Sequence, residues 1–504
     1  MAGADRADLM PAGVGGTPGA GGTPVVGGTP GASGTPGVGG ASGVGGTPGV
    51  AGTPGVGGTP GVGGTPGVAG TPGLDGTRRA EAARRAASAV WRIESARIVG
   101  ALSRFTGDFA LAEDVAQEAL AEALVTWSRD GAPAEPVGWL LATARRRAID
   151  AFRRRSALDE RYALLAGQLG EGQFSSGGRA APGRPDDLPW DPDRIDDDVL
   201  ALMFTACHPV LSPEARVALT LRVVGGLSSE EIARAFLVPT PTVQARITRA
   251  KKTIAAARVP FALPPPEERR ERLGAVLSVL YVIFTEGSTA TAGDRLLRPD
   301  LAYEAVRLAR TLAALLPAEP EVYGLLALFE LTAARFPART GPDGQAVLLE
   351  DQDRRLWDRS AVRRGLAALG RATSAGRGLG PYGLQAAIAV CHDTAPSVRE
   401  TDWERVVLLY EALGRVAPSP VVELNRAVAV AMASGPRRAL RVVDELASSG
   451  ALSGSHLLPS VRGELLTRLG RTAEARAELE LAARLCRNAR ERSVLLGKAA
   501  ALGR

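Results

Sequence analysis

The sequence is poor in cysteine and in long apolar segments, and each shortage excludes a class of protein. Its 504 residues include three cysteines, Cys207, Cys391 and Cys486, which lie too far apart for a disulfide framework and indicate a reducing compartment. His208 and His392 follow two of them directly, but neither pair has the spacing of zinc ligands, so no metal site is predicted. No apolar run approaches the length of a membrane span, and the N-terminus lacks the apolar core of a signal peptide. We therefore expect a cytoplasmic protein with no membrane partner.

Strand-like alternation of polar and apolar residues is equally scarce. Alanine, leucine, arginine and glutamate dominate after residue 77, so we predict an all-α fold. The sequence also contains no phosphate-binding loop, no dinucleotide-binding glycine motif and no strand–serine–helix elbow. It therefore predicts neither enzyme activity nor a cofactor.

Residues 1–78 are predicted to be a tail rich in glycine, threonine and proline. From Gly13, glycine begins each triplet except the one at Val25, which is the register of a collagen triple helix. Many triplets are GVG or GVA, however, and large apolar groups are too few to form a core. We predict a disordered tail, and a triple-helical trimer is the alternative.

Residues 79–156 are predicted to form three helices, of which the second carries an acidic face. In DFALAEDVAQEALAEALVTW, Asp114, Glu118 and Glu122 stand at i, i+4 and i+8. Like charges at this spacing destabilise a helix by roughly a few tenths of a kcal/mol per pair. A basic protein partner would turn that cost into attraction, whereas a solvated face is the alternative.

The third of these helices, VGWLLATARRRAIDAFRRR, is rich in arginine. The net charge of the whole chain is only +6, yet this helix concentrates six arginines against one acidic residue, Asp150. Such a density predicts binding to phosphates, and a solubilising face is the alternative. The arginines of this helix are Arg145, Arg146, Arg147, Arg153, Arg154 and Arg155.

A flexible linker is predicted to follow this helix, over residues 157–194.

Residues 195–260 contain SSEEIARAFLVPTPTVQARITRAKKTI, which predicts a helix-turn-helix. Ser228 and Glu231 can form a capping box at the start of the first helix, and Pro239 ends that helix. Thr240 is predicted to cap the second helix. Small polar residues near its start would contact base edges in the major groove and basic residues further along would contact phosphates, although a hairpin in a helical bundle is the alternative. These residues are Thr242, Gln244, Arg246, Arg249, Lys251 and Lys252.

Residues 264–504 are predicted to form helical hairpins. The clearest, LLPSVRGELLTRLGRTAEARAELELAARL, has small residues at the positions typical of a tetratricopeptide (TPR) hairpin. Such arrays expose a concave face, usually to a protein or peptide ligand, and a pure scaffold is the alternative.

The motifs together resemble those of an extracytoplasmic-function (ECF) sigma factor of bacterial RNA polymerase. AEDVAQEALAEAL and GWLLATARRRAIDAFRRR resemble the sigma-2 domain, and LSPEARVALTLRVVGGLSSEEIARAFLVPTPTVQARITRAKKTI resembles sigma-4. Leu237 stands where the turn usually has glycine. That departure, together with LPPPEERRERLGAVLSVLYVIFTEGSTAT and VLLEDQDRRLWDRS, is similar to a subgroup with a long C-terminal extension.

The resemblance implies a role for each group of residues. Asp114, Glu118 and Glu122 would bind the clamp of the RNA polymerase core, whose flap is a further expected partner. The −35 promoter element would be bound by the six residues of the second helix of the turn named above. The −10 element would be held by Trp139, Arg145, Arg146, Arg147, Arg153 and Arg154. The extension would regulate initiation or be required for it.

Two other functions fit part of the sequence. A stand-alone helix-turn-helix regulator with a repeat-type sensor domain would explain the turn and the repeats, but would leave the acidic and arginine-rich helices unexplained. An interaction scaffold would leave all the basic segments merely solvated.

Overall fold

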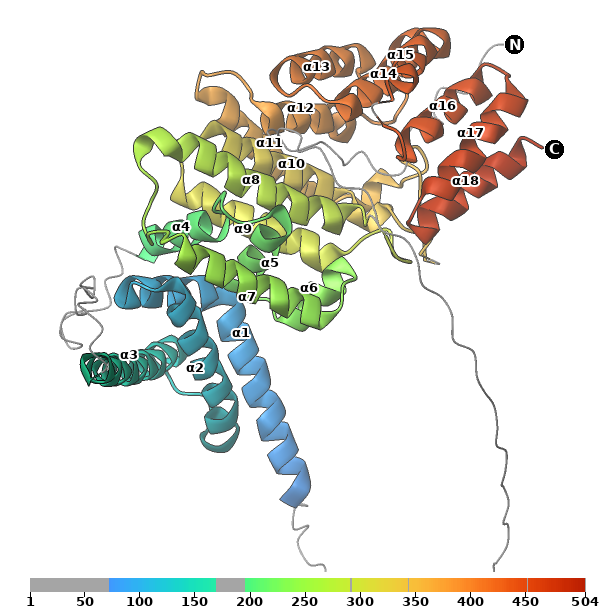
Figure 1. The fold of residues 1–504 in the computed structure, drawn as a ribbon. Helices are drawn as coiled ribbons and strands as arrows, with labels where there is room; N and C mark the ends of the chain where they lie inside the picture. The colour runs from blue at the N-terminus through green and yellow to red at the C-terminus, as the bar shows by residue number, and fades with distance from the viewer. Residues whose placement is uncertain (1–71, 169–194, 291, 343, 451, 504) are drawn as a thin grey trace, which may run out of the picture.

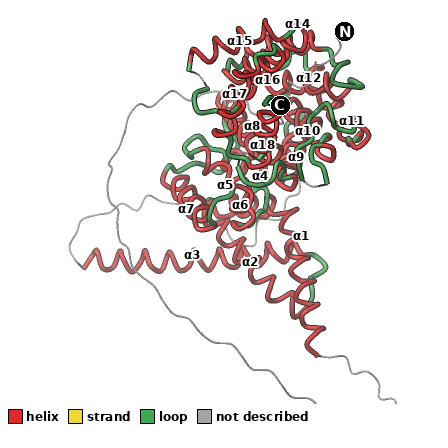
Figure 2. The backbone as a smooth tube through the Cα atoms, turned by 90° about the vertical axis from the view of Figure 1, so that its right-hand side faces the viewer, coloured by secondary structure: helices red, strands yellow, loops and turns green. Residues whose placement is uncertain are grey.

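The computed structural model describes residues 72–168, 195–290, 292–342, 344–450 and 452–503, and these residues are almost entirely helical (Figures 1 and 2). Within them, pairing between extended segments is limited to two isolated bridges. The predicted all-α class is therefore confirmed. Of the predicted tail, residues 1–71 lie outside the described residues, whereas residues 72–78 already belong to the first helix, α1 (Pro72–Thr106), so the helix begins before the expected boundary.

The N-terminal unit consists of α1 (Pro72–Thr106), α2 (Phe109–Asp130) and α3 (Pro136–Gln168). Asp108 caps α2, because its carboxylate accepts hydrogen bonds from the N–H groups of Ala110 and Leu111. Helix α3 extends past the expected start of the linker, since SALDERYALLAGQ contains no proline and its glycine is next to last. Figure 2 shows α3 projecting away from the body of the protein.

The second unit consists of α4 (Ile195–Ala206), α5 (Pro213–Val223), α6 (Ser229–Phe236) and α7 (Thr240–Ala256). In Figure 1 it lies between the N-terminal unit and the remaining helices. Helices α6 and α7 form the predicted helix-turn-helix.

The remaining helices form a C-terminal array, which we call the extension. Many of its helices begin at a proline, whose fixed φ suits the first turn and whose missing N–H needs no partner there. The helices are α8 (Pro266–Ser288), α9 (Pro299–Leu315), α10 (Pro320–Ala334), α11 (Arg359–Ser374), α12 (Pro381–Thr394), α13 (Trp403–Val416), α14 (Pro420–Ser434), α15 (Pro436–Ser449), α16 (Leu457–Arg468), α17 (Thr472–Leu485) and α18 (Ala489–Ala501), with short 3-10 turns at Phe336–Ala338 and Arg354–Leu356.

One hydrophobic core joins the N-terminal unit, the second unit and the first helices of the extension. It runs without a break from Ala83 on α1 to Ala389 on α12. A second core fills the middle of the extension, and a third lies between α17 and α18. The two N-terminal units are therefore packed against each other and against the extension.

Candidate nucleic-acid and polymerase interface

The helix-turn-helix is closed by two local features. Ser228 accepts a hydrogen bond from the N–H of Glu231, and the Glu231 carboxylate accepts one from the N–H of Ser228, which confirms the capping box. Helix α6 then ends at Leu237, whose φ of 52° and ψ of 41° are left-handed. A left-handed backbone costs roughly 1–2 kcal/mol for a residue with a Cβ, which explains why glycine is usual at this position. Contacts with surrounding residues must offset this cost at Leu237.

The recognition helix α7 presents its apolar edge inward, with Val243 and Ile247 buried. Its N-cap is Pro239 and no side chain caps it, so the expectation that Thr240 is the cap was wrong: Thr240 is already the first helical residue. Gln244 is exposed. Of the other predicted DNA-contacting residues, Arg249 and Lys252 are exposed and Thr242, Arg246 and Lys251 are half-buried.

Lys251 is not available to a phosphate in this arrangement. Its Nζ lies 2.6 Å from Glu113 Oε2 and 2.5 Å from Asp114 Oδ1, both on α2 of the N-terminal unit. Arg222 on α5 donates to the other Glu113 oxygen, at 3.2 Å. Burial opposes it, but the two carboxylates raise the pKa of Lys251. A predicted DNA-binding residue and a predicted polymerase-binding residue therefore neutralise each other.

The acidic face of α2 is paired within the molecule as well. Glu118 and Glu122 accept hydrogen bonds from Arg147 on α3, at 2.8 Å and 2.7 Å. The side chains of Asp114 and Glu118 remain 60% and 53% exposed. The arginine offsets the repulsion expected along α2, and the exposed carboxylates still leave an acidic surface for a partner.

The arginine-rich face of α3 is divided between packing and exposure. The guanidinium of Arg145 lies 5.7 Å from the centre of the Phe105 ring, and Trp139 packs edge-on against Trp127 on α2. Burial, and then the charge of Arg104, lower the pKa of Arg145. By contrast, four arginines of α3 are exposed: Arg155 pairs with Asp108 at 3.7 Å, whereas no ion pair with another described side chain is seen for Arg146, Arg153 and Arg154.

Helix α1 forms a second contact between the two units. A Cβ on Gly226 would lie 2.8 Å from Ser95 Oγ, so only glycine fits where the loop before α6 meets α1. Arg92 pairs with Glu231 of the capping box at 2.6 Å. Nearer the end of α1, Arg104 pairs with Asp198 on α4 at 3.2 Å. Ion pairs thus flank an apolar contact.

The extension holds the turn of the helix-turn-helix from the opposite side. Arg298, just before α9, donates to the carbonyl of Ala235 at the end of α6 and pairs with Glu286 on α8. A Cβ on Gly293 would lie 2.8 Å from Leu237 Cδ1. These contacts restrain the residue that carries the left-handed backbone. Arg298 could not be identified from local sequence, because its partners lie on other elements.

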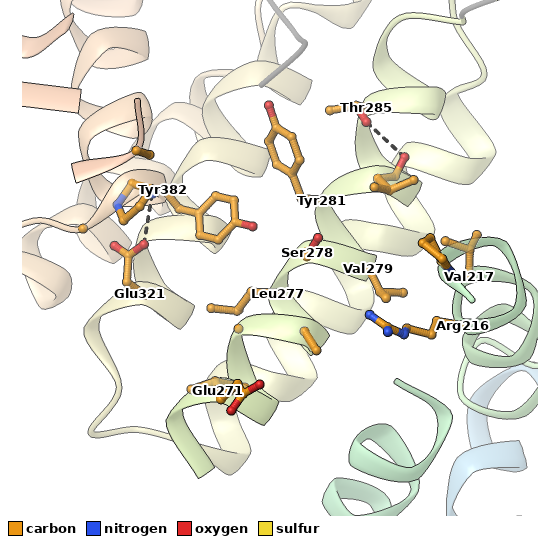
Figure 3. Close-up of a pocket in the computed structure, with 18 of the residues that line it drawn as sticks. Arg216, Val217, Glu271, Leu277, Ser278, Val279, Tyr281, Thr285, Glu321 and Tyr382 are labelled. Atoms are coloured by element: carbon orange, nitrogen blue, oxygen red, sulfur yellow. Dashed lines mark hydrogen bonds between the residues drawn. The ribbon is translucent and has the colours of Figure 1, made fainter. Parts of the chain in front are cut away.

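A groove runs along α8 between the second unit and the extension, with a volume of about 1280 Å³ (Figure 3). Arg216 and Val217 of α5 lie at one side, and Tyr281 and Tyr382 at the other, with ring centres 5.4 Å apart. Arg246 of the recognition helix also lines it.

The two cysteine–histidine pairs considered in the sequence are parts of the core. Cys207 is buried and its Sγ lies 3.3 Å from Thr220 Oγ1. The ring of His392 packs edge-on against Trp403.

Among the described helices, none has both the length and the apolar character that a lipid bilayer requires of a spanning segment.

Comparisons with known proteins assign the same two units. Sigma-70 region 2 matches residues 92–157, sigma-70 region 4 matches residues 201–254, and a family of unknown function, DUF6596, matches residues 272–373. The uncharacterized protein R00370 of Rhizobium meliloti is 42% identical over 405 residues, which cover 78% of this chain and 90% of that protein.

A more distant match is the probable ECF RNA polymerase sigma factor SigI of Mycobacterium tuberculosis, in two strains. It is 29% identical over 188 residues, which cover 36% of this chain and 59% of SigI. No solved structure matches the chain.

Proposed function

This chain belongs to one family with the Rhizobium meliloti protein R00370 and carries regions 2 and 4 of a sigma factor, and we propose that it directs RNA polymerase to promoters as an ECF-type factor controlled by its extension. The observation that carries the proposal is the order of the two regions, each with its expected charged helix. Region 2 would hold the −10 element through the exposed arginines of α3. Region 4 would read the −35 element through Gln244 and its neighbours on α7.

The packed arrangement of the two regions supports a closed state. Elements centred about 10 and about 35 base pairs upstream of the start lie roughly 85 Å apart, at ~3.4 Å per base pair. Lys251 and Glu113 are in direct contact, so the two regions cannot occupy both elements in this arrangement. Promoter binding would require α2 and α7 to separate.

Control by the extension rests on its contacts with region 4. Arg298 holds the end of α6, and Arg307 on α9 donates to the carbonyl of Val224 at 3.3 Å. A protein or peptide ligand bound to the extension could shift the equilibrium between closed and open states only by binding one of them more tightly. The TPR-like character of the hairpins and the nature of that ligand stay predictions.

The proposal is tested by co-purification with core polymerase and by transcription in vitro. Glu118→Lys tests docking more directly than a change at Asp114. Asp114 also pairs with Lys251, so its reversal would change the contact between α2 and α7 as well as the acidic face. We expect Glu118→Lys to reduce binding to core polymerase roughly tenfold or more, since the reversal places like charges against a basic partner. Glu480→Lys on α17 is the matched control, being a similarly exposed glutamate paired with an arginine.

Two outcomes would contradict the proposal. Equal binding by both variants and the unchanged chain would remove the acidic face from the polymerase interface. Specific binding to duplex DNA with no association with core polymerase would favour the stand-alone regulator instead.

A further inference from the structure

Three side chains from separate elements converge at the far end of the extension. His456 is the N-cap of α16, Cys486 is the C-cap of α17, and Glu491 lies in the first turn of α18. His456 Nε2 lies 3.1 Å from Glu491 Oε1, and Cys486 Sγ lies 3.6 Å from Glu491 Oε2. One possible ligand atom from each residue lies within 4.8 Å of the others.

We propose that His456, Cys486 and Glu491 form a zinc-binding site that fastens the last three helices of the extension together. Tetrahedral zinc, with bonds of about 2.0–2.3 Å, places neighbouring ligand atoms roughly 3.3–3.6 Å apart. The two oxygens of Glu491 lie 3.1 Å from the His456 nitrogen and 3.6 Å from the Cys486 sulfur, and one atom from each residue lies within 4.8 Å of the others, so a side-chain shift of about 1 Å would bring three ligand atoms to that spacing. Thiolate and imidazole ligands favour Zn²⁺ over Mg²⁺ or Ca²⁺, which take oxygen ligands, and three protein ligands leave a fourth position for water.

The charge balance of the site suits a divalent cation. A thiolate and a carboxylate together offset the two charges of Zn²⁺. Zinc binds a cysteine as its thiolate, so binding releases the proton of the Cys486 thiol to solvent. Cys486 is buried, but the side chain of His456 is 25% exposed, which leaves an entry path.

Hydrogen bonds connect the cluster to the loop that contacts the helix-turn-helix. Asn488, between two of the ligands, donates from Nδ2 to the carbonyls of Ala290 and Arg295, both at 2.9 Å. The N–H of Ala489 donates to the carbonyl of Gly293, also at 2.9 Å. This loop between α8 and α9 is the one that touches Leu237 and carries Arg298. Zinc that holds α16, α17 and α18 together would therefore restrict the motion of the loop between α8 and α9, which contacts the turn between α6 and α7.

The test uses the full chain stripped of metal and titrated with zinc chloride, without polymerase or DNA, so its outcome is independent of the proposed function. We expect one Zn²⁺ per chain, and cobalt substitution should give a thiolate–metal charge-transfer band. Cys486→Ala and His456→Ala should each weaken zinc binding by more than ~100-fold, since even outer-shell changes cost 10–100-fold. Cys391→Ala and His208→Ala are the matched controls and should bind normally.

Hydrogen exchange of the unchanged chain provides a readout that does not depend on the folding of any variant. Zinc should slow amide exchange in residues 486–492 and 292–298. Absence of zinc binding to the unchanged chain, undiminished binding by Cys486→Ala, or slowing confined to other segments would each overturn the proposal.

Discussion

Replacing Glu113 with glutamine should loosen the contact between α2 and α7 while leaving every predicted DNA- or polymerase-binding residue itself unchanged, including Lys251, which pairs with Glu113. The carboxylate is 4% exposed and accepts from Lys251 Nζ at 2.6 Å and from Arg222 Nε at 3.2 Å. Glutamine has the same shape but no charge. Both cations stay near α2 and lose their main counter-charge.

The magnitude follows from these contacts. Hydrogen bonds to charged groups contribute about 1.5–3 kcal/mol each. The amide oxygen retains one acceptor, and Asp114 still holds Lys251, so the net loss is smaller than the sum of two bonds. We expect about 2 kcal/mol, which corresponds to a shift of roughly 30-fold toward separation of the two units.

Hydrogen exchange and DNA binding measure this shift. Amide exchange in residues 248–256 of α7 should accelerate by up to roughly 30-fold, while exchange in α17 stays unchanged. Affinity for a duplex with the −35 element should rise, because the two units separate more often and each separation frees Lys251 for a phosphate. Glu94→Gln is the matched control, since Glu94 pairs with Arg97 inside α1. Equal acceleration in α7 and α17 would mean that Glu113 stabilises the whole fold, and the reasoning about opening would be refuted.

Three further predictions concern other contacts. Gln244→Ala should change base preference at one −35 position, whereas Lys252→Ala should weaken binding to all sequences and lower the salt slope by about 1; unchanged preferences in a binding selection would remove Gln244 from base contact. Arg298→Met should lower the free energy of unfolding by about 3 kcal/mol in denaturant titrations, because it removes the charge of Arg298 from Glu286, whose side chain is only 13% exposed; the exposed Arg295→Met is the control. Asp393→Asn should make the free energy of unfolding rise more steeply with pH between about 4 and 6.5. Burial raises the pKa of Asp393 to about 6, so this carboxyl favours the fold at low pH, whereas burial lowers the pKa of His392 to about 3, so the histidine favours the fold at higher pH. Equal slopes for variant and parent would contradict the assignment.

Local features of the helix-turn-helix could be predicted from sequence because their causes are local. The capping box depends on Ser228 and Glu231, three residues apart, and the buried edge of α7 depends on helical spacing. The pairing of Arg147 with Glu118 and Glu122 also left a signal, since opposite charges on consecutive antiparallel helices face each other. The Lys251–Asp114 pair joins residues far apart in the chain, and a single sequence holds no information about that contact.

On the proposed function, the closed arrangement makes polymerase and promoter DNA act together. Asp114 can face either Lys251 or the polymerase, and Lys251 can face either α2 or a phosphate. Polymerase that engages the acidic face competes with Lys251 and so releases the recognition helix. DNA that engages Lys251 in turn releases Asp114. By linkage each partner raises the affinity of the other by the same factor. Because the two units also share an apolar core along α1, the charged contact alone does not set the cost of opening, and both partners are needed to offset it.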